Sequence, residues 1–248
     1  MSETFEIVVQ RALEDNFQYL VIREGEAVAV DPAEGGQLRE AVRGRGLRLT
    51  AILVTHEHWD HVAGVEELAA ATGAKVMGLG GMSGVAVDVE LEGNERIELL
   101  GTEWGVLLTP GHCRVHAAYG LAEAKAVFTG DALFAGGCGR LFGNPPEWMA
   151  ESLRTLGGLP EDWTVYGGHD YVKDNLAFAM SIEPGNRDLA KRVERNKAGF
   201  APSTIGEEKR TNPFLRTGVA EVQAAVGLEG GSEVAVFAAL RLRKDGWR

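Results

Sequence analysis

The sequence predicts an α/β protein with a helical C-terminal domain. Apolar segments of strand length, several of them ending next to Gly, Asp or His, follow one another as far as residue 169. Beyond that residue the apolar positions recur with helical spacing, and no further strand is expected. We therefore place an α/β domain at residues 1–172 and a helical domain at residues 173–248. The length of 248 residues and the hydrophobic content of 45% are sufficient for a large core.

The first part of the chain predicts short strands and two helices. Three antiparallel strands, recognisable as apolar or alternating segments between turn residues, are expected at residues 5–9, 17–22 and 27–30. The apolar run at residues 51–54 is typical of a buried parallel strand. Helical spacing appears at residues 37–42 and 62–71, and Gly73 is expected to end the second helix.

Later segments predict more strands and then the helical domain. Glycine-interrupted apolar pieces between residues 75 and 108 indicate strands joined by loops. Three further strands that precede candidate ligands are expected at residues 106–109, 126–129 and 163–166. Helices are expected at residues 171–180, 187–197, 219–226 and 233–243, the last with Ser232 as its N-cap. Residues 203–212 are polar and are expected to form a loop.

The segment Thr55-His56-Glu57-His58-Trp59-Asp60-His61 directly follows the expected parallel strand. Open α/β sheets place their sites at this carboxyl end of the strands. His56 and His58 can point in the same direction in an extended chain, whereas Asp60 and His61 lie beyond the turn. Two groups of ligands therefore indicate two metal ions.

The ends of later strands supply further ligand-type residues, namely His112, Asp131 and His169. We expect one ion to be bound by His56, His58 and His112, and the second by Asp60, His61 and His169. Asp131 is expected to bridge both ions through its two oxygens, and Asp60 also to orient an attacking hydroxide. Imidazole and carboxylate ligands suit two divalent ions, with Zn²⁺ expected first and Fe or Mn²⁺ as alternatives. This arrangement is the template for metal-assisted hydrolysis.

The composition argues against several other classes of protein. A net charge of −11 is unsuited to nucleic acid or an anionic membrane as the main partner. There is no signal-peptide pattern and no apolar run of membrane-spanning length, so we expect a cytoplasmic protein, a monomer or weak homo-oligomer. Cys113 and Cys138 lack C-x-x-C spacing and are expected to be buried free thiols.

Four of these motifs resemble those of the metallo-β-lactamase superfamily: residues 55–61, Thr109-Pro110-Gly111-His112, Gly130-Asp131 and Gly168-His169. The resemblance implies an αββα sandwich. More narrowly, residues 136–142 and 202–216 resemble glyoxalase II, the hydroxyacylglutathione hydrolase family. That resemblance extends through both domains and implies hydrolysis of the thioester S-D-lactoylglutathione to D-lactate and glutathione, in the detoxification of methylglyoxal.

The family's glutathione-contacting positions fall on Arg140, Phe142, Tyr171, Arg241 and Lys244. Cationic side chains suit the carboxylates of glutathione, and Arg241 and Lys244 are spaced to share one face of the last helix. Phe142 stands where the family often has tyrosine, so one hydroxyl contact to the peptide would be missing.

Residues 113–116, Cys-Arg-Val-His, replace the family's usual Thr-x-Gly-His. Cys113 is therefore an alternative extra ligand, although the site is complete without it, and His116 is expected to support the site or the core. Three other functions compete with thioester hydrolysis: a glutathione persulfide dioxygenase with a single iron, a hydrolase of another ester or lactone or of a β-lactam, and a non-catalytic metal-binding protein. The helical C-terminal domain argues against a different hydrolase substrate.

Overall fold

The computed structural model describes residues 4–197 and 202–247. The chain divides into two compact units that do not coincide with a single cut in the sequence. Unit 1 contains residues 1–108 and 115–130, and unit 2 contains residues 109–114 and 131–248. No helix in the described ranges is long and apolar enough to cross a membrane.

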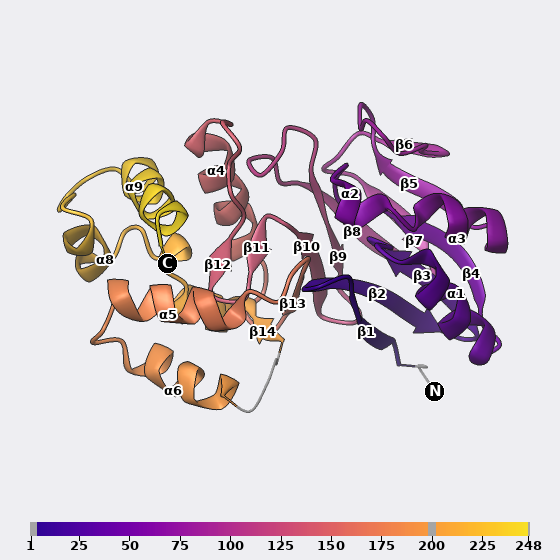
Figure 1. The fold of residues 1–248 in the computed structure, drawn as a ribbon, viewed down its shortest axis with the longest axis horizontal. Helices are drawn as coiled ribbons and strands as arrows, with labels where there is room; N and C mark the ends of the chain where they lie inside the picture. The colour runs from indigo at the N-terminus through magenta and orange to yellow at the C-terminus, as the bar shows by residue number, and fades with distance from the viewer. Residues whose placement is uncertain (1–3, 198–201, 248) are drawn as a thin grey trace. The chain divides into compact units, whose positions relative to one another are not determined.

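Unit 1 contains a sheet whose strands are paired in chain order (Figure 1). Its strands are β1 (Glu6–Ala12), β2 (Asn16–Arg23), β3 (Glu26–Val30), β4 (Arg48–Leu53), β5 (Lys75–Leu79) and β6 (Val89–Leu91). The pairs β1–β2 and β2–β3 are antiparallel, which confirms the prediction for the first three strands. The strands β3, β4, β5 and β6 run parallel, so the strand before the histidine segment is a buried parallel strand as predicted.

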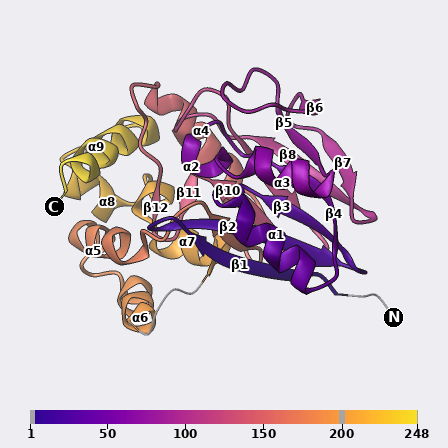
Figure 2. The same ribbon diagram turned by 45° about the vertical axis from the view of Figure 1, so that its right-hand side comes forward.

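Helices α1 (Gly35–Gly44) and α3 (Val65–Thr72) cover one face of this sheet (Figure 2). Leu38 of α1 and Leu68 of α3 are completely buried in one cluster with Leu20 and Ile52 of the sheet. Burial of apolar area in this layer stabilises the unit by roughly 1.5–3 kcal/mol for each large side chain. The packing also fixes where the end of β4 lies.

The remaining strands of unit 1 form an antiparallel set made of β7 (Arg96–Leu99), β8 (Thr102–Leu108), β9 (Ala117–Leu121) and β10 (Ala126–Gly130). This set packs on the other face of the first sheet. Tyr19 of β2 meets Phe128 of β10 edge to face, with ring centroids 5.3 Å apart. The hydroxyl of Tyr119 donates to the carbonyl of Val54 at 2.7 Å, and burial raises the pKa of this tyrosine. Two sheets packed face to face therefore form the core of the unit.

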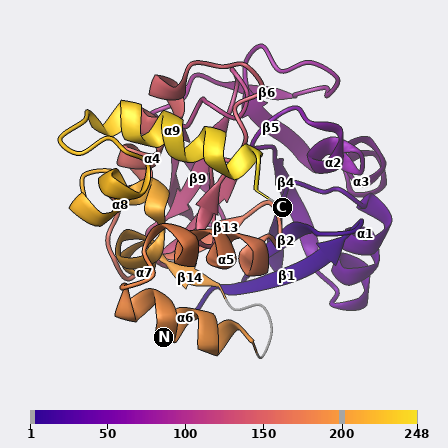
Figure 3. The ribbon, with the colours of Figure 1, turned by 60° about the vertical axis from the view of Figure 1, so that its left-hand side comes forward.

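Unit 2 begins with the short paired strands β11 (Leu133–Phe134) and β12 (Gly137–Cys138) and continues mainly as helices (Figure 3). The helices are α4 (Pro146–Gly157), α5 (Val172–Ile182), α6 (Arg187–Asn196), α7 (Ile205–Thr211), η1 (Pro213–Leu215), α8 (Ala220–Ala225) and α9 (Glu233–Asp245). Strands β13 (Thr164–Gly167) and β14 (Ser203–Thr204) complete the unit. The predicted helices are confirmed to within a few residues at each end.

The structure corrects the prediction for residues 203–212, which form β14 and α7 rather than a loop. Ser203 and Thr204 pair antiparallel with Val165 and Thr164, so a short strand does follow residue 169. The hydroxyl of Thr204 then accepts the backbone N–H of Glu207 at 3.2 Å and caps the helix. The sequence Thr-x-x-Glu is a capping-box pattern, and this signal was overlooked because the segment is polar.

The predicted helix at residues 62–71 is interrupted, and α2 (Trp59–Val62) is separate from α3. Gly64 lies at the break, where its N–H donates to the carbonyl of Pro32 at 2.8 Å. A Cβ atom at this position would lie only 2.1 Å from the nitrogen of Gly35, so the close approach requires glycine. Gly73 ends α3 in the left-handed conformation as predicted. Helix α4 was not predicted.

Candidate metal centre

The histidine segment of unit 1 brings three imidazole rings together at the end of β4. The ring centroid of His56 lies 4.7 Å from that of His58 and 4.2 Å from that of His61. His56 and His61 are buried, whereas His58 and Asp60 are partly exposed. The chain therefore holds several ligand-type side chains of one short segment at a single point, as the motif predicts.

Asp31, at the end of β3, orients two of these rings together with Thr55. Its carboxylate accepts the backbone N–H of Thr55 at 2.8 Å and the hydroxyl of Thr55 at 2.6 Å, and it lies 3.0 Å from Nδ1 of His61. Because the hydroxyl hydrogen of Thr55 goes to Asp31, the Thr55 oxygen must accept the Nδ1–H of His56 at 3.0 Å. Both histidines thus carry a proton on Nδ1, and in their neutral form Nε2 is the nitrogen available to a metal ion.

Asp60 is oriented by β2. The side-chain amide of Asn16 donates to the Asp60 carboxylate at 3.0 Å and to its backbone carbonyl at 3.1 Å. The same carboxylate oxygen lies 3.7 Å from Nε2 of His61, so the two side chains are neighbours as predicted. Neither Asn16 nor Asp31 was predicted as part of the site. Asp31-Pro32 at a strand end was the only local sign, and it reads equally well as a turn.

His116 is completely buried, in agreement with its predicted supporting position. Its ring stacks on that of His56 with the centroids 5.0 Å apart, and the two residues form an isolated antiparallel bridge. Gly130 has a φ of 46°, and a Cβ there would lie 3.0 Å from Nε2 of His116 and 2.4 Å from Oγ1 of Thr55. The glycine before Asp131 thus leaves room for the residues that support His56.

The three predicted ligands of unit 2 also lie together, although they come from distant parts of the sequence. Oδ2 of Asp131 lies 3.3 Å from Nε2 of His112 and 3.4 Å from Nε2 of His169. The Nδ1 of His112 lies 2.9 Å from the carbonyl oxygen of Arg140, which can only accept, so Nδ1 carries the proton. In the neutral ring with this tautomer, the lone pair on Nε2 of His112 faces the Asp131 carboxylate oxygen.

A cation between Nε2 of His112 and the carboxylate oxygen of Asp131 would be attracted to both, so this geometry fits a metal ion. The donor set agrees: histidines held through Nδ1 by oxygen acceptors, together with carboxylates, suit a borderline divalent ion. Cys113 is buried, and its part as an extra ligand stays a prediction. The residues present in each unit thus fit divalent metal ions, while the identity of the metal is left open by this donor chemistry.

Two aromatic side chains predicted to contact substrate flank the ligands of unit 2. Phe142 is 69% exposed and meets the ring of His112 edge to face at 5.2 Å, and its φ of 45° lies in the left-handed region. Tyr171 stacks on His169 with the centroids 4.8 Å apart and the planes within 4°. Arg140 has an exposed side chain whose Nε lies 3.9 Å from Asp245. All three lie in the same unit as the ligands that they flank.

The side chains of the two cations of α9, Arg241 and Lys244, are largely buried. The guanidinium of Arg241 is buried, donates to the carbonyl of Cys138 at 2.8 Å and lies 2.9 Å from Asp245. Lys244 forms an ion pair with Asp174, and burial lowers its pKa while Asp174 opposes the shift. Burial raises the pKa of the Cys138 thiol to about 11, despite the opposing effect of Arg241.

Two family models match the chain. A model described as "Metallo-beta-lactamase superfamily" matches residues 13–81 and 79–169. A second model, "Hydroxyacylglutathione hydrolase C-terminus", matches residues 170–247. The two models together cover nearly the entire chain, and the second covers the helices α5 to α9.

Curated relatives match over nearly their full length. A protein of Methylococcus capsulatus named hydroxyacylglutathione hydrolase is 44% identical, and the match covers 98% of this chain and 99% of the relative. A protein of Cereibacter sphaeroides with the same name is 42% identical, with 97% and 98% covered. One of Rhodospirillum rubrum, also so named, is 39% identical, with 98% of each chain covered.

Solved structures share the fold. The crystal structure of ETHE1 from Myxococcus xanthus has a TM-score of 0.70 at 27% identity and covers 96% of this chain and 89% of its own. The crystal structure of TTHA1623 in a di-iron-bound form has a TM-score of 0.62 at 28% identity, with 84% and 98% covered. The predicted fold class, an αββα metallo-β-lactamase sandwich with a helical C-terminal region, is confirmed by these similarities.

Proposed function

Because the chain belongs to the hydroxyacylglutathione hydrolase family of the metallo-β-lactamase superfamily, we propose that it cleaves S-D-lactoylglutathione. Water is added across the thioester, the carbon–sulfur bond breaks, and the products are D-lactate and glutathione. The observation that carries this proposal is that the similarity includes the C-terminal helices, which match a model specific to this hydrolase. The reaction removes a product of methylglyoxal detoxification.

We propose that the ligands of both units serve one two-metal centre, as the family motif implies. His56, His58 and His112 would hold one ion, Asp60, His61 and His169 the second, and Asp131 both. When bound, such ions would lower the pKa of a bound water molecule and polarise the substrate carbonyl. Zinc is proposed first, with iron or manganese as alternatives. The Nδ1 hydrogen bonds of His56, His61 and His112 support this assignment.

The two carboxylates have different parts in the proposed reaction. Asp131 lies within 3.4 Å of two imidazole nitrogens and supplies the negative charge that compensates bound cations. Asp60 is partly exposed and is held by Asn16, and in the proposed reaction its carboxylate orients a water molecule for attack. Such positioning favours a near-attack geometry without a protein nucleophile.

We propose that Arg140 and Lys244 bind the carboxylates of glutathione, with Phe142 and Tyr171 against the remainder of the substrate. Arg140 is exposed, and its Nε lies 3.9 Å from Asp245, so its guanidinium can turn to a substrate carboxylate. Tyr171 and Phe142 each contact one proposed ligand ring, which supports a position for both beside the reacting group. Arg241 belongs to the predicted set, but its N–H groups are directed to Cys138 and Asp245.

Three further properties are proposals of the same kind. The functional division into residues 1–172 and 173–248 is supported by the two family models, which meet at residues 169 and 170. A cytoplasmic location is supported by the two free cysteines, which suit a reducing compartment. The acidic net charge supports a monomer or weak homo-oligomer with a small glutathione thioester, and neither nucleic acid nor membrane, as its partner.

The proposal is tested by turnover of S-D-lactoylglutathione by protein of measured metal content. We expect release of free thiol with two metal ions per chain, and loss of turnover when a chelator removes the ions. Absence of turnover from protein that carries two ions would contradict the assignment. Oxygen consumption with glutathione persulfide by protein that carries a single iron would instead favour the dioxygenase alternative.

A further inference from the structure

Four consecutive residues, Ala135 to Cys138, are held through their backbone by side chains of the C-terminal helices. Asn175 of α5 donates to the carbonyl of Ala135 at 3.2 Å, and Glu208 of α7 accepts the N–H of Gly136 at 2.9 Å. Asn212 donates to the carbonyl of Gly137 at 3.0 Å, and Arg241 of α9 donates to that of Cys138 at 2.8 Å. We call these residues, 135–138, the held segment.

The held segment leads directly to a proposed metal ligand. Gly139 follows it, and a Cβ at this position would lie 2.1 Å from the carbonyl oxygen of Asp131 and 2.9 Å from Nδ1 of His112. Next along the chain, the carbonyl of Arg140 accepts the Nδ1–H of His112 at 2.9 Å. The position of Cys138 therefore determines where the acceptor for His112 lies, with only one residue between.

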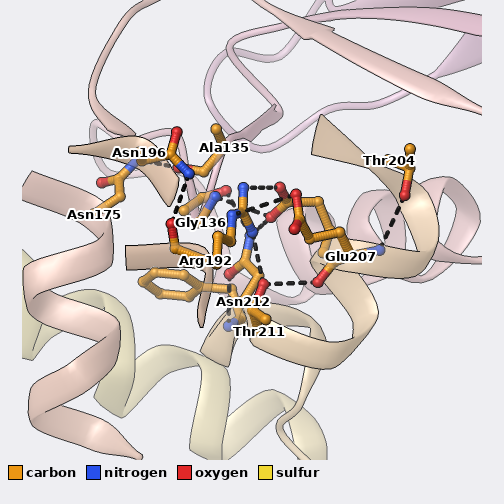
Figure 4. Close-up of polar contacts among 12 residues, drawn as sticks. Ala135, Gly136, Asn175, Arg192, Asn196, Thr204, Glu207, Thr211 and Asn212 are labelled. Carbon is orange, nitrogen blue, oxygen red and sulfur yellow. Dashed lines mark hydrogen bonds and ion pairs between the residues drawn. The ribbon is translucent and has the colours of Figure 1, made fainter. Parts of the chain in front are cut away.

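A buried ion pair fixes the side chains that hold this segment (Figure 4). Arg192 of α6 is 1% exposed, and it forms an ion pair with the buried Glu208 and donates to Thr211 at 2.6 Å. The amide of Asn212 donates to the same glutamate at 3.0 Å. Arg241 is similarly fixed, because it lies between the Cys138 carbonyl and Asp245 and over the ring of Phe214. Because the side chains of Glu208, Asn212 and Arg241 have few alternative positions, the backbone of the held segment is also fixed.

We infer that Arg241 is a positioning residue for the metal ligand His112, acting through the backbone of Cys138 and the carbonyl of Arg140. The inference rests on the proposed function only in taking His112 as a ligand. It assigns to α9 a part in the metal centre beyond its predicted contact with glutathione. The hydrogen-bond acceptor of a metal-binding histidine fixes the orientation and basicity of its ring. For His112 this acceptor is the carbonyl of Arg140, and Arg241 acts on its position through the backbone of Cys138.

The inference predicts that Arg241→Met weakens metal binding. The methionine preserves most of the apolar stem but cannot donate to the Cys138 carbonyl, so the Arg140 carbonyl is no longer fixed. We expect the dissociation constant for Zn²⁺, measured by competition with a chromophoric chelator, to rise about tenfold, the lower end of the range for outer partners. The visible absorption of the Co²⁺-substituted protein should also change, because it reports on ligand geometry.

Two further variants separate positioning from folding and from substrate contact. Arg241→Lys retains a donor for the Cys138 carbonyl and should recover part of the affinity. Asn175→Ala acts on the same segment from α5, and the same two readouts should shift in the same direction by a smaller amount. Arg243→Met is the matched control, because Arg243 is exposed on α9 and donates to Ala225, outside the held segment.

The outcomes are distinct. Unchanged Zn²⁺ affinity and Co²⁺ absorption in folded Arg241→Met, with a raised KM for the thioester, would make Arg241 a substrate contact and overturn the inference. A lower melting temperature with both metal readouts unchanged would make it structural and also overturn it. If Arg241→Met does not fold, the lysine and Asn175→Ala variants decide by the same criteria. Wild-type protein that binds metal but does not cleave the thioester would contradict only the proposed function.

Discussion

The two units hold their proposed metal ligands in different ways. In unit 1, four ligands lie within the segment from His56 to His61, and side chains near strand ends, Asp31 and Thr55, orient the rings. In unit 2, the ligands are His112, Asp131 and His169, and the acceptor for His112 is a backbone carbonyl in a loop held by helices. The first group depends on a local motif, whereas the second depends on the packing of remote helices.

The difference predicts which substitutions affect the metal centre. A substitution in the C-terminal helices should alter the position of the proposed ligands of unit 2 through the held segment. The proposed ligands of unit 1 should be displaced mainly by substitutions of Asp31 and Thr55. The experiments below follow from this contrast.

The largest effect is expected for Asp131→Asn, which removes the charge between His112 and His169. Loss of metal-assisted stabilisation amounts to several kcal/mol, so kcat/KM for the thioester should fall by about a thousandfold. Metal content per chain, measured by atomic emission, should fall in the same sample. Asp188→Asn, at an exposed position in α6, is the control and should retain both. Full activity in Asp131→Asn would show that Asp131 is not a ligand of the proposed metal centre.

Arg192→Met should destabilise unit 2 by about 3 kcal/mol or more, because it leaves Glu208 buried without its cation. The measurement is urea unfolding of the metal-free protein. The control is Lys191→Met, a change of the neighbouring residue, whose side chain is exposed. The control should lie within roughly 0.5 kcal/mol of the wild type. Equal unfolding midpoints for both variants would show that the helices do not depend on this ion pair, and would weaken the contrast between the units.

Asp31→Asn should weaken metal binding by about 10- to 100-fold, since the neutral amide no longer fixes Nδ1 of His61 and the hydroxyl of Thr55 as a carboxylate does. Chelator competition gives the affinity directly. Asp88→Asn is suitable for comparison, because Asp88 is an exposed aspartate of the same unit that accepts the N–H of Val76. An affinity equal to that of the wild type would show that the unit 1 ligands are oriented without Asp31.

The smallest effect is expected for Ser232→Ala, which removes the cap of α9. The Ser232 hydroxyl accepts the N–H of Ala235 at 3.3 Å, and loss of an N-cap costs about 1 kcal/mol. Thermal unfolding should show this loss, and Ser232→Asp should restore stability. Metal affinity should be unchanged, because the contacts of Arg241 near the other end of the helix persist. A large loss of affinity would mean that the position of α9 depends on its first turn.

Much of the fold was predictable because its signals are local. The apolar run before His56 identifies a buried parallel strand, and Ser232 identifies the start of α9. Helix α7 was not predicted, because its polar surface hides the pattern and only the Thr204 cap marks it. The break at Gly64 depends on contact with Pro32 and Gly35, residues whose approach is decided by tertiary packing.

The site shows the same distinction. Four proposed ligands in one segment are visible in the sequence, and a histidine or aspartate after each later strand marks the other three proposed ligands. The outer partners were not visible. Asp31 acts across the sheet on Thr55 and His61, and Arg140 acts on His112 through a carbonyl that every residue type possesses. A backbone acceptor leaves no mark in the sequence, so only the structure shows which residue supplies it.

The backbone carbonyl and the side chain of Arg140 have different roles. Its carbonyl supports His112, whereas its guanidinium extends into solvent with 69% of the side chain exposed. Replacing the Arg140 side chain should leave its carbonyl in place, because the backbone of residues 135–138 is held by side chains of the C-terminal region. Under the proposed role of Arg140 in substrate binding, this position is a natural site for protein engineering, because its charge can be reversed or removed while the acceptor for His112 is retained.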